Sequence, residues 1–168
     1  MKRRYLLAAL LSTLPHFCLA VEPLTLGGVS LLQPESDIQP RVRSVEELSS
    51  YIKSIQSASS KFFKNHPSIQ SSSGYIVVAV KPVQQSNVWF DFTPKLPGEV
   101  AMQLSKDIRR LLPMRVTQGP VVFALQVGVN GAKPPSGPMP RPEEWAAEAG
   151  KVGHPIETSE MVLRLWQP

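Results

Sequence analysis

Two apolar runs close together in the chain, residues 75–80 and 87–92, constrain the fold more than any other feature. The first run, YIVVAV, is apolar at every position, which predicts a strand in the middle of a sheet with both faces buried. The second run, NVWFDF, places Trp89 and Asp91 on the face opposite to its three other large side chains, Val88, Phe90 and Phe92. The segment between the runs is polar and contains a proline, so the two runs predict an antiparallel β-hairpin.

Amphipathic helices flank this hairpin. Ser44 and Glu47 have the spacing of a capping box, and apolar residues then recur every three or four positions until Pro67 ends the helix. Residues 99–112 carry a second apolar stripe of the same kind. Residues 121–127 predict a third strand with four apolar side chains on one face, namely Val121, Phe123, Leu125 and Val127.

The order helix, strand, strand, helix, strand predicts an α+β fold. A hairpin pairs antiparallel, and a helical crossover then places the third strand in the same sheet. We therefore expect a small antiparallel sheet of about three strands with two helices packed on one face. The arms at both ends are available to extend this sheet or to lie over it, and Thr25 to Leu32 have the composition of an edge strand.

Composition divides the chain into five segments. In order, they are a signal peptide (1–20), an extended N-terminal arm (21–43), the α+β core domain (44–129), a Pro/Gly-rich linker (130–142) and a C-terminal helix and strand segment (143–168). In the last segment, Pro142 followed by two glutamates predicts the start of a short helix, which Gly150 ends. The run MVLRLW at 161–166 predicts a short final strand.

The first twenty residues have the pattern of a secretory signal peptide. A basic start, KRR, precedes a short apolar run, and Cys18 and Ala20 place small residues at positions −3 and −1 of a cleavage site. The apolar run is much shorter than the ~20 residues that span a bilayer, so we expect cleavage after Ala20 and no stable membrane span afterwards. The predicted location is the periplasm, which suits a secreted domain that has no disulfide.

Cleavage changes the chemistry that the chain can perform. Removal of 20 of the 168 residues takes away Cys18, the only cysteine, so the mature chain of 148 residues has no disulfide and no thiolate. The count of 18 basic residues falls to 15 against 13 acidic ones, a net charge of +2. No basic run with interleaved aromatic residues is present, so we expect no binding of nucleic acid.

Residues 44–129 resemble the C-terminal domain of the TonB/TolA family of periplasmic proteins. The resemblance lies in the order of the elements: an amphipathic helix, the hairpin YIVVAV…NVWFDF, a second helix VAMQLSKDIRRLLP and the closing strand GPVVFALQV. It differs from that family in its cleavable signal and in a Pro-rich segment that follows the domain. The resemblance implies a periplasmic module that binds another envelope or secreted protein through an exposed sheet edge.

Catalytic motifs are absent from the sequence. The chain contains no HExxH, no Gly-x-Ser-x-Gly elbow and no phosphate-binding loop. Of the histidines that follow the signal, His66 precedes a proline at a helix end and His154 lies in a Gly-His-Pro turn, both structural positions. We therefore expect no enzyme, no cofactor and no metal site; a serine hydrolase stays open as a class without a motif behind it.

Trp89, Asp91 and Lys81 form the candidate protein-binding site. If the opposite face of the hairpin packs on the helices, Trp89 lies on a face without an obvious cover, and an exposed tryptophan is a common anchor in interfaces. Lys81 is expected near Asp91 across the hairpin, as part of this site or as a surface ion pair. The alternative is that the last strand, with Leu163, Leu165 and Trp166, folds over Trp89 and makes a second small core.

Two functions are compatible with these features. The first is a protein-binding module of the cell envelope that pairs through a sheet edge and has no catalytic activity. The second is a periplasmic immunity protein that inhibits a delivered toxin, since size, signal and the lack of catalytic motifs suit both. The Pro-rich stretch 134–142 is either a spacer or a polyproline ligand for a partner.

Overall fold

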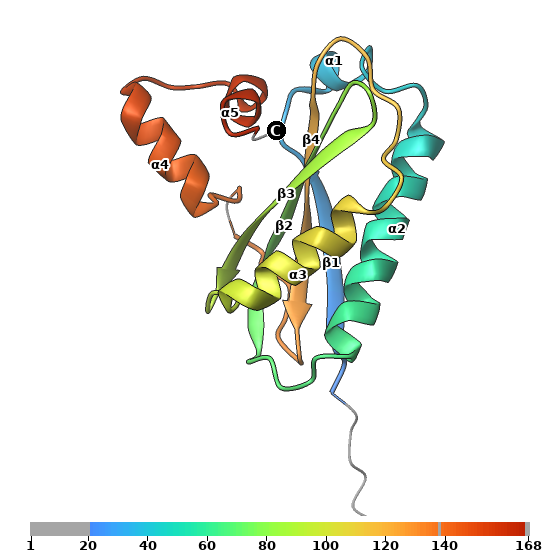
Figure 1. Ribbon diagram of the computed structural model, residues 1–168, viewed down its shortest axis with the longest axis vertical. Coiled ribbons are helices and arrows are strands. Elements are labelled where there is room, and N and C mark those ends of the chain that lie inside the picture. Colours follow the sequence, from blue (N-terminus) through green and yellow to red (C-terminus); the bar gives the residue numbers. More distant parts are fainter. Residues whose placement is uncertain (1–20, 138, 167–168) are drawn as a thin grey trace, which may run out of the picture.

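The computed structural model describes residues 21–137 and 139–166, so the predicted signal peptide lies outside the described residues. Figure 1 shows the arrangement of the helices and strands. In chain order they are β1 (Leu24–Leu31), α1 (Glu35–Ile38), α2 (Val45–Lys64), β2 (Ser72–Lys81), β3 (Gln85–Thr93), α3 (Gly98–Arg109), β4 (Val121–Val129), α4 (Glu143–Val152) and α5 (Thr158–Arg164).

The sheet has four strands in the order β1-β4-β2-β3, and each neighbouring pair is antiparallel. The predicted hairpin is β2 and β3, with Val77 of β2 opposite Trp89 of β3 and Ala124 of β4. Its turn is tight because Val83 and Gln84 both adopt positive φ. The N-terminal arm supplies β1 at the edge, so the sheet has one strand more than the three expected for the core. The α+β class is confirmed.

Two long helices cover one face of the sheet, as the sequence predicts. The Ser44 side chain accepts a hydrogen bond of 3.1 Å from the backbone N–H of Glu47, which caps α2. Figure 1 shows α2 and α3 together on one side of the sheet. The buried side chains of this helix-face core come from both helices and from all four strands, among them Ile55, Phe63, Leu104, Ile108, Leu24, Ile76, Val78, Phe123, Leu125 and Phe92.

The opposite face of the sheet carries a smaller second core. Its buried side chains are Leu32, Tyr75, Val77, Ala79, Trp89, Val122, Ala124 and Val162. Three partly buried residues of the C-terminal segment pack against them, namely Trp145, Leu165 and Trp166. The C-terminal segment therefore lies over the face that the sequence alone left without a cover.

The prediction of a final strand at residues 161–166 is wrong, because the segment is helical. In α5 the backbone N–H of Met161 donates to Glu157 over 2.9 Å, and that of Leu165 donates to Met161 over 3.1 Å. A short apolar run has no periodicity that separates strand from helix. The helix before it, α4, runs past the predicted end at Gly150 and stops at Gly153, which adopts the left-handed conformation of a C-cap.

None of the helices in residues 21–137 and 139–166 combines the length and the apolar character that crossing a membrane requires.

Candidate functional site

Trp89 is not exposed. Only 6% of its surface is accessible, and its ring meets that of Trp145 edge-on with 5.6 Å between the centroids. The predicted phase of β3 is correct, because Val88 and Phe92 belong to the helix-face core and Trp89 to the second core. The expectation of an open face is wrong, since the folding-over of the C-terminal segment, the alternative stated from the sequence, covers this tryptophan.

Lys81 and Asp91 lie at opposite ends of the hairpin. In the register of β2 and β3, Lys81 is opposite Gln85, whereas Asp91 is opposite Tyr75, six residues earlier on β2. The Lys81 Nζ instead lies 4.4 Å from the centre of the Trp166 ring, a cation–π contact with the C-terminal segment. The expected proximity of the two charges is therefore wrong, and the three predicted site residues do not form one patch.

Asp91 holds the Pro/Gly-rich linker against the sheet. Its Oδ2 accepts a hydrogen bond of 2.7 Å from the backbone N–H of Arg141. On the neighbouring strand, the Tyr75 hydroxyl donates to the carbonyl oxygen of Gly137 over 3.2 Å. A Cβ at Gly128 of β4 would overlap the carbonyl oxygen of Ala132, so glycine allows the linker to approach that strand. The described residues of the linker 130–142 therefore pack against the sheet and do not form a free spacer. We call this segment the strap.

A groove of about 360 Å³ runs along β3, the edge strand next to α3. Five consecutive residues of β3 line it, from Val88 to Phe92, and therefore include Trp89 and Asp91. The other lining residues come from the start of α3 and its preceding loop and from the end of the strap and the start of α4: Lys95, Leu96, Gly98, Ala101, Arg141, Glu143 and Glu144. One side of the groove is therefore formed by α3 and its preceding loop, and the other side by the end of the Pro/Gly-rich linker and the start of α4, which are distant from each other in sequence.

A salt bridge connects the two sides of this groove. The Lys95 Nζ lies 2.6 Å from Glu143 Oε1, and the side chains are 70% and 77% exposed. An exposed pair of this kind contributes at most about 1 kcal/mol, so it closes the groove weakly. A second hollow of about 320 Å³ adjoins the first, because Asp91 and Arg141 line both. Together the hollows follow β3 and reach under the strap.

The sequence predicts some of the residues that line this groove but not those at its rim. Trp89 and Asp91 were predicted as binding residues, but Lys95, Arg141 and Glu143 were not. Glu143 was interpreted only as an acidic residue in the first turn of a helix, which it is. No short-range pattern connects these residues, because Lys95 and Glu143 meet only after the strap has crossed the sheet.

The described residues contain no cluster with the composition of a metal site. No group of three or more His, Cys, Asp or Glu side chains in residues 21–137 and 139–166 is placed to hold an ion. The His66 ring nitrogen Nδ1 lies 2.8 Å from the carbonyl oxygen of Phe62, and that of His154 lies 3.0 Å from the carbonyl oxygen of Pro155. Both imidazoles thus contact backbone at the ends of elements.

Two acidic groups away from the groove have shifted pKa values. Hydrogen bonding from the backbone of Glu46 itself, and then from the Ser44 side chain, lowers the pKa of that exposed carboxyl from its ordinary 4.5. Burial in the helix-face core raises the pKa of the Tyr51 hydroxyl from its ordinary 10.0. The pKa shift of Glu46 reflects its position at a helix N-terminus, and that of Tyr51 reflects its burial in a packed core. Neither shift indicates a catalytic acid or base.

Comparison of the chain with models of known families, with curated proteins and with solved structures finds no match. The resemblance to the TonB/TolA family therefore stays a prediction, and the function is argued from the groove.

Proposed function

We propose that this chain is a non-catalytic protein-binding module of the cell envelope, which holds an extended segment of a partner in the groove beside β3. The observation that carries this proposal is the position of the groove along an edge strand. Within the described residues β3 pairs with β2 alone, so its other side offers backbone groups to a further strand. Addition of a strand to a sheet edge is a common mode of peptide recognition.

The lining of the groove suits a peptide of alternating character. An extended segment beside β3 directs successive side chains to opposite faces of the sheet. On the helix side it meets Phe90 and Ala101, which are apolar and half-buried. On the strap side it meets Asp91 and Arg141, which offer one charge of each sign. We therefore expect a partner segment in which apolar residues alternate with polar or charged ones.

The proposed envelope location rests on the signal peptide predicted from the sequence, and the predicted resemblance to the TonB/TolA family supports the edge-pairing mode. Trp89 acts within this proposal as part of the groove floor, not as an exposed anchor. Its indole packs on Trp145 and so connects the floor of the groove to the C-terminal segment. Binding at β3 is expected to change the environment of this tryptophan pair.

Site-specific cross-linking in cells tests the proposal. A photo-reactive amino acid in place of Lys95, on the rim of the groove, should cross-link one defined envelope protein. The same residue in place of Lys151, which is exposed on α4 away from the groove lining, is the positional control. Mass spectrometry of the cross-linked peptide should identify an extended, alternating segment of the partner.

A pair of substitutions on α3 then separates groove binding from other contacts. Ala101→Arg places a long side chain in the groove, whereas Gln103→Arg places the same side chain on the exposed side of the helix. We expect the first to abolish cross-linking and the second to leave it unchanged, with similar melting temperatures. Equal cross-linking by both variants would contradict the proposal. If cross-linking instead captures a toxin that the chain inhibits, and Ala101→Arg does not change that inhibition, the result would favour the alternative function as an immunity protein.

A further inference from the structure

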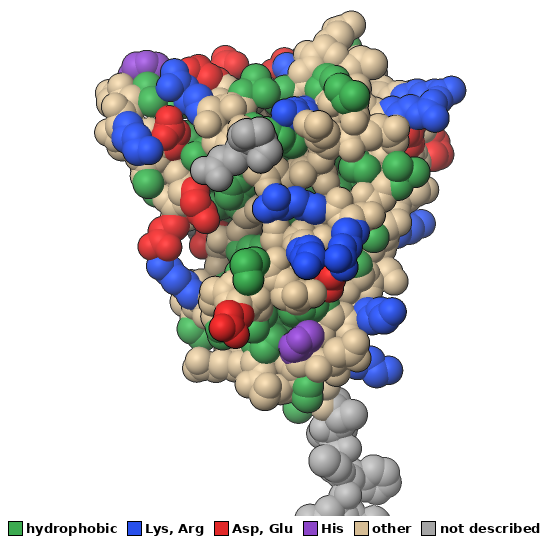
Figure 2. Space-filling model, in the orientation of Figure 1, with side chains coloured by type: hydrophobic (Ala, Val, Ile, Leu, Met, Phe, Trp, Pro, Cys, Tyr) green, Lys and Arg blue, Asp and Glu red, His purple; other side chains and the backbone are tan. Residues whose placement is uncertain are grey.

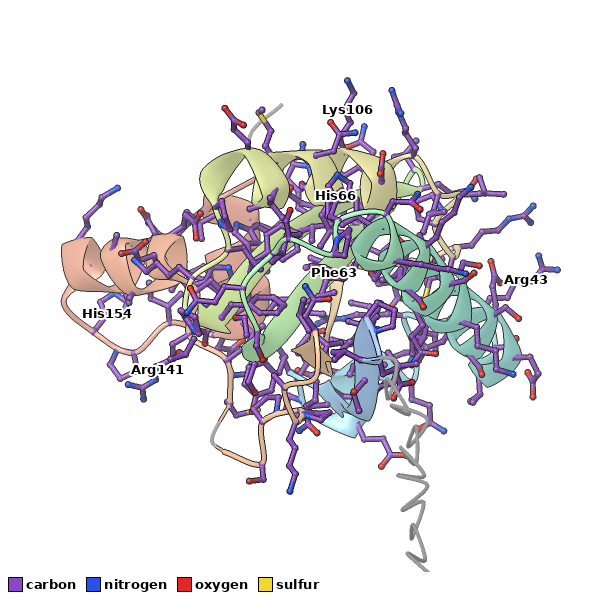
Figure 3. All side chains as sticks on the ribbon, turned by 90° about the horizontal axis from the view of Figure 1, so that it is seen from below. Arg43, Phe63, His66, Lys106, Arg141 and His154 are labelled. Carbon is purple, nitrogen blue, oxygen red and sulfur yellow. The ribbon has the colours of Figure 1, made fainter. Side chains whose placement is uncertain are left out.

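The outward side of α3 forms a second surface, distinct from the groove, on which positive charge is concentrated. Met102, Lys106 and Arg109 follow one another at intervals of four and three residues, so they lie on one stripe of the helix, and all are exposed. Figure 2 shows Lys and Arg side chains gathered over α3. In Figure 3 the labelled Lys106 points away from the molecule, so its ammonium group is free to meet another surface.

The end of α2 extends this basic surface. Lys61 of α2 and Arg110 at the end of α3 line one shallow groove of about 330 Å³ together with His66, which lies between the two helices in Figure 3. Asp107 is the carboxylate among the lining residues, and it lies 3.8 Å from the Arg110 guanidinium. One acid therefore opposes two permanent cations there, and Lys106 and Arg109 add two more beside it.

The charge on this surface is not a reflection of the whole chain. Residues 53–64 and 98–115 together contain seven Lys and Arg residues against two Asp and Glu. The C-terminal residues 143–166 contain two basic residues against five acidic ones. Basic residues are thus concentrated at the end of α2 and on α3 and its following loop, and this leaves a positive field around the outward side of α3 that is stronger than the net charge of the chain indicates.

Exposed apolar side chains stand at both ends of the basic stripe. Met102 is 69% exposed, and Leu112, just after the helix, is 79% exposed. Cations that flank projecting apolar side chains suit the surface of an anionic bilayer, where the cations meet phosphate headgroups and the apolar groups enter the interface. An acidic protein segment would match the charge and would give these two side chains no comparable apolar environment.

We infer that this surface, formed by Lys61, Met102, Lys106, Arg109, Arg110 and Leu112, docks the protein on anionic phospholipid membranes. It shares no residue with the lining of the β3 groove, so the inference does not depend on the proposed function. In the docked orientation the outward side of α3 lies against the headgroups.

Sedimentation with lipid vesicles tests this inference. Every described helix and strand lies after Val21, so the chain from Val21 onward, which contains all of them, is the form to test. We expect it to bind vesicles of phosphatidylglycerol and phosphatidylcholine, to release as NaCl is raised, and to bind poorly to pure phosphatidylcholine. The combination Lys106→Gln, Arg109→Gln and Arg110→Gln should lower the partition coefficient about a hundredfold, since each basic residue near an anionic surface contributes roughly a fivefold factor.

The matched control removes the same charge elsewhere. Arg43→Gln, Lys133→Gln and Lys151→Gln change three exposed residues outside α3 and should lower the partition coefficient less than tenfold. Met102→Ser with Leu112→Ser should reduce the binding that persists at high salt, without changing the net charge. These side chains are exposed, and circular dichroism should show unchanged melting for all three variants.

Three results of the vesicle-binding comparison would overturn the inference. They are equal binding to neutral and anionic vesicles, an equal loss of binding in the α3 variant and in the control, and the absence of binding to either lipid. Release of the bound chain by polyglutamate far more effectively than by NaCl of the same ionic strength would also overturn it, in favour of an acidic protein as the natural partner.

Discussion

The two faces of the sheet are covered in different ways. One carries α2 and α3, helices of 20 and 12 residues whose apolar stripes enter a continuous core. The other carries a strap and two short helices, and no residue of α4 is buried. On that face the contact depends on a few side chains, chiefly Val162 of α5 and the tryptophan pair Trp89 and Trp145.

This difference separates the part of the molecule that stabilises the fold from the part that shapes the groove. The helix face buries large side chains in interlocking layers, so we expect most of the free energy of folding to come from it. The second cover buries less and contributes Arg141, Glu143 and Glu144 to the groove. The proposed binding site thus lies where the stable core meets the thinner cover.

The largest expected effect is on the helix face. Phe123 is fully buried and meets the Tyr51 ring edge-on at 6.2 Å between centroids. Phe123→Ala should lower the free energy of unfolding by about 3–5 kcal/mol, because it leaves a cavity at a side chain that has no exposed surface. Denaturant titration measures this loss. An unchanged unfolding midpoint would mean that the helix face does not dominate stability.

A smaller loss is expected on the second face. Trp89→Ala removes a buried ring, but the cover above it can move inward, so we expect a loss of about 3 kcal/mol, at the lower end for such substitutions. The matched variant is Trp145→Phe, because the Trp145 Nε1–H is buried without a hydrogen-bond acceptor in the described residues. Trp145→Phe keeps the aromatic contact, and its unfolding midpoint should be unchanged or higher. A larger loss for Trp89→Ala than for Phe123→Ala would reverse the comparison of the two faces.

Alkaline pH should remove the contribution of the buried Tyr51 hydroxyl to stability. Burial raises the pKa of Tyr51 above its ordinary 10.0, so the unfolded chain loses this proton at lower pH than the folded chain does. The contribution is fully present below the ordinary pKa and is lost as pH rises through the raised value. The free energy of unfolding, measured from pH 9 to 11, should therefore fall less steeply in Tyr51→Phe than in the parent chain, because the variant lacks this titrating hydroxyl. Parallel profiles for the two chains would argue against a buried hydroxyl.

The smallest effect is expected at the rim of the groove. Lys95→Ala breaks the exposed salt bridge to Glu143, and the loss of stability should be within about 1 kcal/mol. High salt should lower stability less in the variant than in the parent chain, because the variant has already lost the Lys95–Glu143 interaction that salt screens. A loss comparable to that of Trp89→Ala would show that the strap and α4 depend on this pair rather than on the second core.

The elements with a strong local pattern were predictable. The cap at Ser44, the phase of the hairpin and the apolar face of the third strand each follow from residues within a few positions of one another. The helical structure of α5 was not predictable from the sequence. The spacing of Met161, Val162 and Leu165 is compatible with a strand and also with one and a half turns of helix. Only its docking beside Val122 on the second face selects between them.

The residues that line the groove were likewise only partly predictable from the sequence. Trp89 and Asp91 stood out because they share one face of a patterned strand. Lys81 was assigned to them wrongly, because the register of a hairpin decides which side chains are neighbours and a shift along the strand moves them apart. Arg141 and Glu143 reach the site through the strap, and a Pro/Gly-rich segment carries no periodicity that indicates where it will lie.

The sequence by itself therefore determined the α+β class, the order of the core elements and the side of β3 that meets the helices. These features follow from periodicity and from capping, which act between residues close in the chain. The tertiary structure decided which strand took the second edge, what covered Trp89 and which charges met at the groove. Those outcomes depend on contacts between residues about fifty or more positions apart, such as Asp91 with Arg141, whose free energies no local pattern encodes.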